Sequence, residues 1–125
     1  MDENELVTIL VDIVYQVHIT LGPGLLESVY EEAISFELAQ QNLEFKRQQG
    51  IPVNYKGVKL DLGFRADIIV ENKIIIEIKS VDLLASVHFK QVLTYLKLTD
   101  LRLGLLVNFN SALIKHGIKR VVNNL

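Results

Sequence analysis

The stretch from Phe64 to Ser80, FRADIIVENKIIIEIKS, contains two apolar runs rich in β-branched residues on either side of Glu71-Asn72-Lys73. Two such runs separated by a short polar segment are typical of a β-hairpin, and runs this apolar are typical of strands at the centre of a sheet. The stretch therefore predicts the central hairpin of the fold. Because side chains alternate along a strand, one face is expected to be wholly apolar and to carry Phe64, Ala66, Ile68, Val70, Ile74, Ile76 and Ile78.

The length of the hairpin loop decides which charged residues meet. A loop of three residues, 71–73, places Asp67 opposite Glu77 on the second face of the hairpin. Arg65 and Lys79 then share that face, whereas a two-residue loop would put the two carboxylates on opposite faces. Opposed carboxylates repel each other unless a cation or a proton lies between them. The residues alone leave two interpretations: a cation-binding site, or a sheet end that emerges into water with surface ion pairs of little energetic weight.

The periodicity of apolar residues predicts the remaining elements. Helical spacing predicts helices over Glu3–Leu21, Leu25–Gln41 and Ala85–Leu98. Two short strands are expected within residues 51–62 about a turn at Lys56-Gly57, and further strands within residues 101–110 and 117–122. The order ααββββαββ predicts an α+β domain with a central mixed sheet. We expect a single domain over residues 1–125, with an N-terminal helix (1–21), a core (24–109) and a C-terminal strand region (110–125).

The second helix carries several carboxylates. With Gly24 as its N-cap, Glu27 occupies the third helical position, where a carboxylate suits the helix dipole. On a helical wheel Glu27 lies at the edge of the apolar stripe, Glu31 lies further round and Glu32 points away. The stripe itself is predicted to bury Leu26, Val29, Tyr30, Ala33 and Phe36.

Composition narrows the classes of site. The chain has 125 residues, half of them hydrophobic, which suits one domain with a substantial core. It contains no cysteine, which excludes disulfides and thiolate zinc sites and favours a hard cation held by oxygen. An acidic N-terminal sequence and the absence of a long uninterrupted apolar run predict a cytoplasmic protein that does not bind membranes. The net charge of −2 counts against a nucleic-acid-binding protein, because such domains usually carry a basic excess.

Three motifs resemble those of a known family. Asp67, followed after the hairpin by Glu77-Ile78-Lys79, resembles the signature of the PD-(D/E)xK nuclease-like superfamily, whose core runs αβββαβ. Ala66 stands where the superfamily's name has proline. The stretch from Gly24 to Tyr30 resembles the motif of the GxxExxY family of that superfamily, and the segment from Gln91 to Tyr95 resembles the QxxxY motif of RecB-like nucleases.

The resemblance implies a restriction-endonuclease-like fold and a role for each residue. Asp67 and Glu77 would hold Mg²⁺ or Mn²⁺ with the Ile78 carbonyl as a further ligand, and Lys79 would orient a water molecule or contact the phosphate. Glu27 is expected to be the additional acidic ligand, direct or through water. The expected supporting residues are Gln91 next to a carboxylate or water, Tyr95 and Arg65 near the phosphate, and Tyr30, for which core packing with a hydrogen-bonded hydroxyl is the preferred role. Candidate phosphate contacts are Arg65, Lys90, Lys115, Lys119 and Arg120.

These assignments predict a metal-dependent nuclease, a hydrolase of phosphodiester bonds, with DNA favoured over RNA as substrate. The alternative is a non-catalytic module that keeps the nuclease fold and binds nucleic acid or protein, as a homodimer or with a partner protein. A third interpretation is an intact site that needs a partner chain to deliver the substrate.

Overall fold

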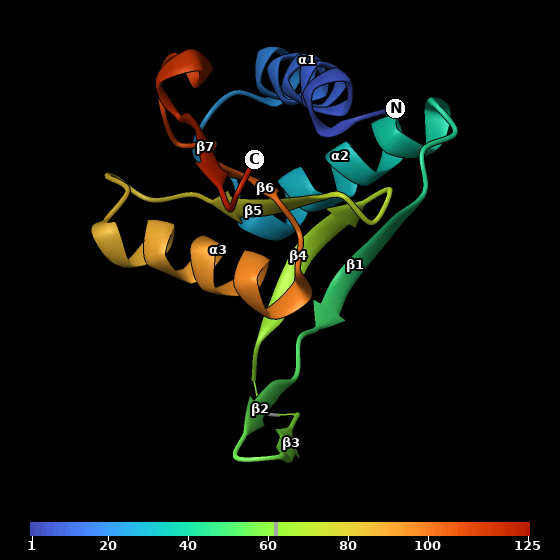
Figure 1. Ribbon diagram of the computed structural model, residues 1–125. Coiled ribbons are helices and arrows are strands. Elements are labelled where there is room, and N and C mark those ends of the chain that lie inside the picture. The colour runs from blue at the N-terminus through green and yellow to red at the C-terminus, as the bar shows by residue number, and fades with distance from the viewer. Residues whose placement is uncertain (62) are drawn as a thin grey trace.

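Five strands form a sheet in the order β1-β4-β5-β6-β7 in a computed structural model that describes residues 1–61 and 63–125 (Figure 1). Only the β5–β6 pair is parallel among the described strands of this sheet, which is therefore mixed. Over the described residues the elements are α1 (Glu3–Leu21), α2 (Glu27–Gln40), β1 (Phe45–Gly50), β2 (Val53–Tyr55), β3 (Val58–Leu60), β4 (Arg65–Val70), β5 (Ile74–Lys79), α3 (Ser86–Thr99), β6 (Leu103–Asn108), a 3-10 helix η1 (Ile114–His116) and β7 (Ile118–Val122).

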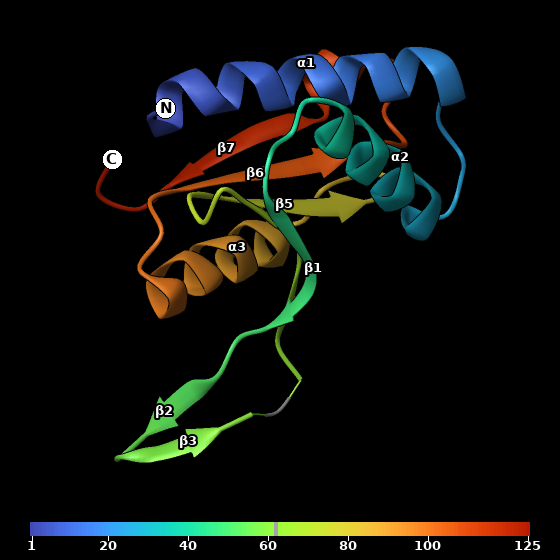
Figure 2. The same cartoon turned by 90° about the vertical axis from the view of Figure 1, so that its right-hand side faces the viewer.

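Helices cover both faces of the sheet, α1 and α2 on one side and α3 on the other (Figure 2). The larger core packs α1 and α2 against one face of the central strands, including Ile68 and Ile76. The smaller core packs α3 against the opposite face, including Ile69 and Ile75. The expected α+β fold is confirmed, and the expected αβββαβ order runs through α2, β1, β4, β5, α3 and β6.

The register predicted for the central hairpin is confirmed. Val70 pairs with Ile74, and the Lys73 N–H donates to the Val70 carbonyl across the three-residue turn. Ladder pairing continues to Ile68 and Ile76 and then stops. Beyond that point Ala66 packs into the α3-side core, and the exposed Phe64 meets the Tyr95 ring of α3, so the expectation that both share a face with Ile68 and Val70 is wrong. The change of face coincides with the loss of pairing to β5, while β4 stays paired with β1 at Arg65 and Ala66.

Strand β1 was not expected, because its residues lie outside the elements that the apolar periodicity predicts. The strand pairs antiparallel with β4, for example Arg47 with Ile68. Its side chains after Phe45 are exposed, and its sequence FKRQQG has no apolar alternation. Edge strands are commonly polar and charged, which discourages further strand pairing but removes the signal that identifies a strand in a sequence.

Helix α2 begins two residues later than expected and buries a different face. Its N-cap is Leu26 rather than Gly24, so Glu27 is the first helical residue. The Tyr30 hydroxyl donates to the Gly22 carbonyl at 2.6 Å and accepts from the Leu25 N–H at 3.1 Å, which holds residues 22–25 outside the helix. The predicted buried stripe is wrong for the exposed Leu26, Val29 and Phe36, and the residues actually buried are Tyr30, Glu31, Ile34, Ser35 and Leu38.

The other predicted elements are close to those observed. Helix α1 has the predicted bounds, and α3 is shifted by one residue. The predicted turn at Lys56-Gly57 joins β2 and β3, whose hairpin projects away from the sheet (Figure 2). Leu62, at the end of the predicted second strand, lies outside the described residues.

Helix α1 is long and apolar enough to pass a length and composition test for a membrane span. Core helices of globular proteins pass the same test, since an apolar face of this length also packs against a sheet. Here that face is used in the larger core, where Leu6, Leu10, Ile13 and Val14 are fully buried.

Candidate active site

Strands β4 and β5 separate where two carboxylates replace backbone pairing. The Asp67 N–H donates to Glu77 Oε1 at 3.0 Å, and the Ile78 N–H donates to Asp67 Oδ2 at 2.8 Å. Each strand thus uses a carboxylate of the other strand to satisfy a backbone donor that the ladder leaves free. The predicted juxtaposition of Asp67 and Glu77 is present, and the backbone holds both side chains in place.

Burial makes this pair electrostatically unusual. Glu77 is only 3% exposed, and burial, followed by the charge of Asp67, raises the pKa of Glu77 from 4.5 to about 8. Burial also raises the pKa of Asp67, although hydrogen bonds from the Ile78 N–H and the Gln48 side chain oppose that rise. The positive charge of Lys79 lowers both pKa values. Such a pair is poorly neutralised by its surroundings, which is typical of functional sites.

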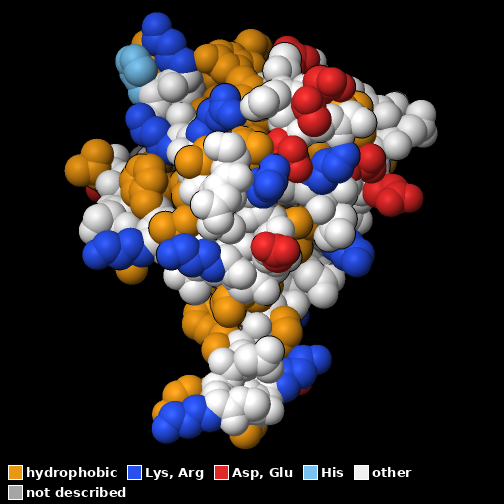
Figure 3. Space-filling model, viewed as in Figure 1, with side chains coloured by type: hydrophobic (Ala, Val, Ile, Leu, Met, Phe, Trp, Pro, Cys, Tyr) orange, Lys and Arg blue, Asp and Glu red, His pale blue; other side chains and the backbone are white. Residues whose placement is uncertain are grey.

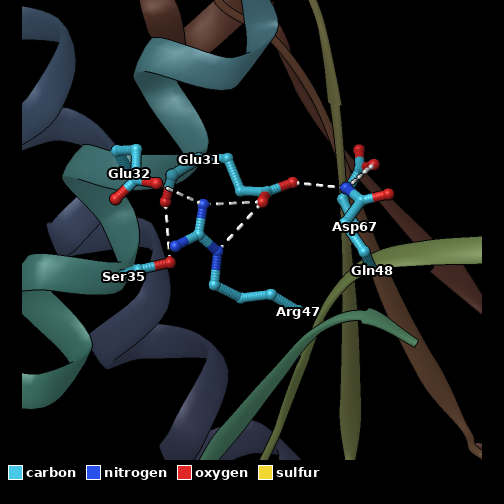
Figure 4. A network of polar contacts seen from close by, with 6 residues as sticks. All are labelled: Glu31, Glu32, Ser35, Arg47, Gln48 and Asp67. Carbon is cyan, nitrogen blue, oxygen red and sulfur yellow. Dashed lines mark hydrogen bonds and ion pairs between the residues drawn. The ribbon is translucent and has the colours of Figure 1, made fainter.

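A third carboxylate, Glu31, points from α2 toward Gln48 and Asp67 (Figure 4). Glu31 is 8% exposed, and its Oε2 accepts from Arg47 Nε at 3.0 Å and lies 2.9 Å from Arg47 Nη2. Its Oε1 accepts from Gln48 Nε2 at 2.6 Å, and the same nitrogen donates to Asp67 Oδ1 at 3.2 Å. Arg47 also pairs with Glu32 at 2.8 Å. Gln48 therefore bridges Glu31 and Asp67.

The α3 side of the site is formed by Tyr95, which is 3% exposed. Burial raises the pKa of Tyr95, and the charges of Glu77 and Asp67 raise it further. A hydrogen bond from the Gln91 side chain acts in the opposite direction on that pKa. The Phe64 ring meets the Tyr95 ring edge-on, with centroids 5.9 Å apart. Tyr95 and Gln91, predicted from the QxxxY resemblance, thus belong to the neighbourhood of the two carboxylates.

The family model described as the PD-(D/E)XK nuclease superfamily matches residues 4–121, most of the chain. The chain belongs to this superfamily. Membership indicates nuclease activity and nucleic-acid binding in general terms, and PD-(D/E)XK nucleases generally use divalent metals. The three α-helices and the mixed five-stranded sheet of the described residues agree with the restriction-endonuclease-like fold. No curated protein and no solved structure matches the chain.

Glu27, expected as the additional acidic residue of the PD-(D/E)XK site, lies elsewhere on α2. It is exposed and lines a cavity of about 550 Å³ together with Ser80, Asp82 and Asn110. The Ser80 hydroxyl donates to the Leu25 carbonyl at this cavity. Glu31, one helical turn further along, is the carboxylate that the structure connects to Asp67. A stripe drawn through Tyr30, Ile34 and Leu38 would have placed Glu31 at the buried edge of α2.

The other predicted site residues differ in burial and in the contacts that they make. Lys79 is partly buried, and its carbonyl accepts from the Phe109 N–H. Ile78 is buried, with its N–H bound to Asp67. Arg65 is exposed beside a cavity at the base of the projecting hairpin. Tyr30 packs in the core as preferred, stacked on Phe109 with ring centroids 4.2 Å apart, and its hydroxyl is bound to the loop before α2.

The predicted phosphate contacts do not form one cluster. Lys119 and Arg120 lie on β7, the edge strand opposite β1, and Lys115 lies in η1. Lys90 lies on α3 next to Gln91, and Arg65 opens β4. Arg65 is therefore two residues from Asp67 on β4, and Lys90 is directly before Gln91 on α3.

The carboxylates supply the donors that Mg²⁺ prefers, namely anionic oxygens with room for several waters. Among the described residues, however, His, Asp and Glu side chains form no group of three arranged to hold a metal ion. The Gln48 amide lies between Glu31 and Asp67 and engages an oxygen of each. The carboxylate donor set fits a hard divalent cation.

Proposed function

We propose that this chain is a divalent-metal-dependent nuclease that hydrolyses phosphodiester bonds, with DNA as substrate in preference to RNA. One observation carries the proposal: across the split between β4 and β5, Glu77 accepts from the Asp67 N–H and Asp67 accepts from the Ile78 N–H, with Lys79 two residues beyond Glu77. Because backbone bonds fix both carboxylates, little reorganisation is needed for them to act together.

In this proposal Asp67 and Glu77 would hold Mg²⁺ or Mn²⁺, with the Ile78 carbonyl as a further ligand. When bound, such an ion lowers the pKa of a water molecule and stabilises charge on the phosphate. Lys79, which already lowers the pKa values of both carboxylates, orients the attacking water or contacts the phosphate as a compact positive charge. Gln91 and Tyr95 position a carboxylate or water and the phosphate, and Arg65 contacts the nucleic-acid backbone next to the site.

Two carboxylates of α2 are candidates for the additional acidic ligand. The Glu31–Gln48–Asp67 bridge favours Glu31. The resemblance to the GxxExxY family favours Glu27, and we also propose that the chain belongs to that family within the superfamily.

We expect Glu31→Gln to weaken Mn²⁺ binding by about tenfold, the size of effect typical for residues that orient or support a metal ligand. Glu27→Gln is the matched control, and calorimetric titration of both variants decides between them. A larger loss of Mn²⁺ affinity in Glu27→Gln than in Glu31→Gln would identify Glu27 as the additional acidic ligand.

The charge of the molecule favours a second candidate, a binding module of the same fold that acts with a partner protein or as a homodimer. The net charge is −2, and Figure 3 shows lysine and arginine side chains scattered over this face and the projecting hairpin, with acidic side chains among them. A nuclease with this surface gains little affinity from counterion release. A partner chain would supply the missing affinity for nucleic acid. We also propose a cytoplasmic location, which a chain without cysteine suits.

The direct test is nicking of supercoiled plasmid by the purified chain. We expect nicking with Mg²⁺ or Mn²⁺ and its loss in EDTA, because the proposed reaction needs the cation. Single-stranded DNA and a structured RNA are assayed in parallel, and we expect DNA to be cleaved faster. Metal binding without cleavage of any substrate would favour the binding module, and faster cleavage of RNA would overturn the choice of substrate.

A further inference from the structure

The Gln48 amide occupies the space between two carboxylates of the site. Its Nε2 lies 2.6 Å from Glu31 Oε1 and 3.2 Å from Asp67 Oδ1. The nitrogen must be the atom that faces them, because an amide oxygen in its place would meet two negatively charged acceptors without a proton to share. A neutral group with two N–H donors thus takes the place between carboxylates that a cation would take.

The backbone of Gln48 is adapted to this position. Its φ is +50°, a left-handed conformation that non-glycine residues rarely adopt. Strand β1 pairs with β4 at Arg47–Ile68 and again at Gln49–Ala66, and the ladder skips Gln48 and Asp67 between them. The irregular backbone turns the Gln48 side chain toward the carboxylates instead of along the sheet edge. A strained backbone conformation of this kind persists only where the surrounding contacts hold it in place.

The two contacts of the amide differ in a way that allows release. Glu31 is held independently by Arg47, at 2.9 Å and 3.0 Å, whereas the bond to Asp67 is the longer of the two amide contacts. Gln48 is exposed and lies on an edge strand, so its side chain can turn into water without disturbing the core. The carboxylates would stay in place after the amide left.

We propose that Gln48 is a positioning residue that closes the metal site, and that its amide must leave Asp67 and Glu31 before a divalent cation can bind there. The inference rests on the proposed function. The amide keeps the two carboxylates close together while the site lacks metal, and it lowers the apparent affinity for the cation by the cost of its own displacement. Gln48 therefore sets the metal concentration at which the site is filled.

The test compares Mg²⁺ and Mn²⁺ affinities, measured by calorimetry, in the wild type, Gln48→Ala and Gln49→Ala. We expect Gln48→Ala to bind either ion roughly 10- to 150-fold more tightly, the range that corresponds to one hydrogen-bonding group with charged partners. Gln49→Ala is the matched control, because within the described residues its side-chain amide donates to the Gly50 carbonyl, at 3.5 Å, and not to a carboxylate. Gln48→Lys should weaken binding more than about tenfold, because its ammonium competes with the ion between the same carboxylates.

A second readout follows the amide itself. In the wild type, addition of Mg²⁺ should shift the side-chain amide resonances of Gln48 and speed their exchange with water, while those of Gln49 remain unchanged. Tighter binding in Gln48→Ala together with these shifts supports the inference. Wild-type binding that Gln48→Ala leaves equal or weaker overturns it and leaves the nuclease proposal standing. Folded protein that binds neither ion, as wild type or as Gln48→Ala, overturns the metal-dependent function itself.

Discussion

Asp67→Asn is expected to abolish measurable Mg²⁺ binding and to reduce plasmid nicking by more than roughly 100-fold, since loss of a metal ligand exceeds the effect of losing a residue that only supports one. Asparagine keeps an oxygen that can accept from the Ile78 N–H, as Asp67 Oδ2 does at 2.8 Å. The split between β4 and β5 should therefore persist. What the substitution removes is the negative charge that attracts the cation.

The control for Asp67→Asn is Asp12→Asn, which makes the same change of charge on α1, where Asp12 accepts a hydrogen bond from Gln16. Calorimetry, nicking and thermal unfolding are measured on the same samples. A folded Asp67→Asn variant that keeps nicking would place the metal site elsewhere in the chain. Loss of nicking in Asp12→Asn as well would attribute the effect to total charge.

The central hairpin could be predicted because its information is local. Continuous apolar runs flank residues 71–73 on both sides, and of the two loop lengths considered only the three-residue loop brings Asp67 and Glu77 to one face. The charged end of an otherwise buried hairpin then marks the site. What the sequence did not reveal is that the carboxylates replace the backbone ladder there, because that depends on where two strands stop pairing.

The contacts of Glu31 could not be predicted from the sequence, because they come from a strand that carries no strand pattern. Arg47 and Gln48 come from β1, whose side chains after Phe45 are exposed. Only the position of β1 beside β4 brings them under α2. The rotation of α2 has a similar origin, since the Tyr30 hydroxyl ties down the preceding loop and sets where the helix begins. Long-range contacts of this kind override the local apolar pattern.

Glu77 should make the metal-free protein less stable as pH rises from about 4.5 to about 8. In the folded chain burial raises the pKa of Glu77 to about 8, against 4.5 for the unperturbed group. Between these values the unfolded chain has lost a proton that the folded chain retains, so the free energy of unfolding falls with rising pH and levels off above the folded-state pKa. At about 1.4 kcal/mol per pKa unit, the loss is on the order of 4 kcal/mol over the window.

Urea unfolding in EDTA at pH 5 and pH 8.5 measures this loss, with Glu77→Gln as the test and the exposed Glu44→Gln as the control. Glutamine stays neutral, so Glu77→Gln should lose less stability between the two pH values than the wild type by a few kcal/mol. Asp67→Asn should reduce the pH dependence in part, because the charge of Asp67 is the second cause of the raised pKa of Glu77. If Glu77→Gln kept the full wild-type pH dependence, the loss of stability with rising pH would come from another group. Glu77 would then be ionised in the folded chain, with its charge compensated by its neighbours.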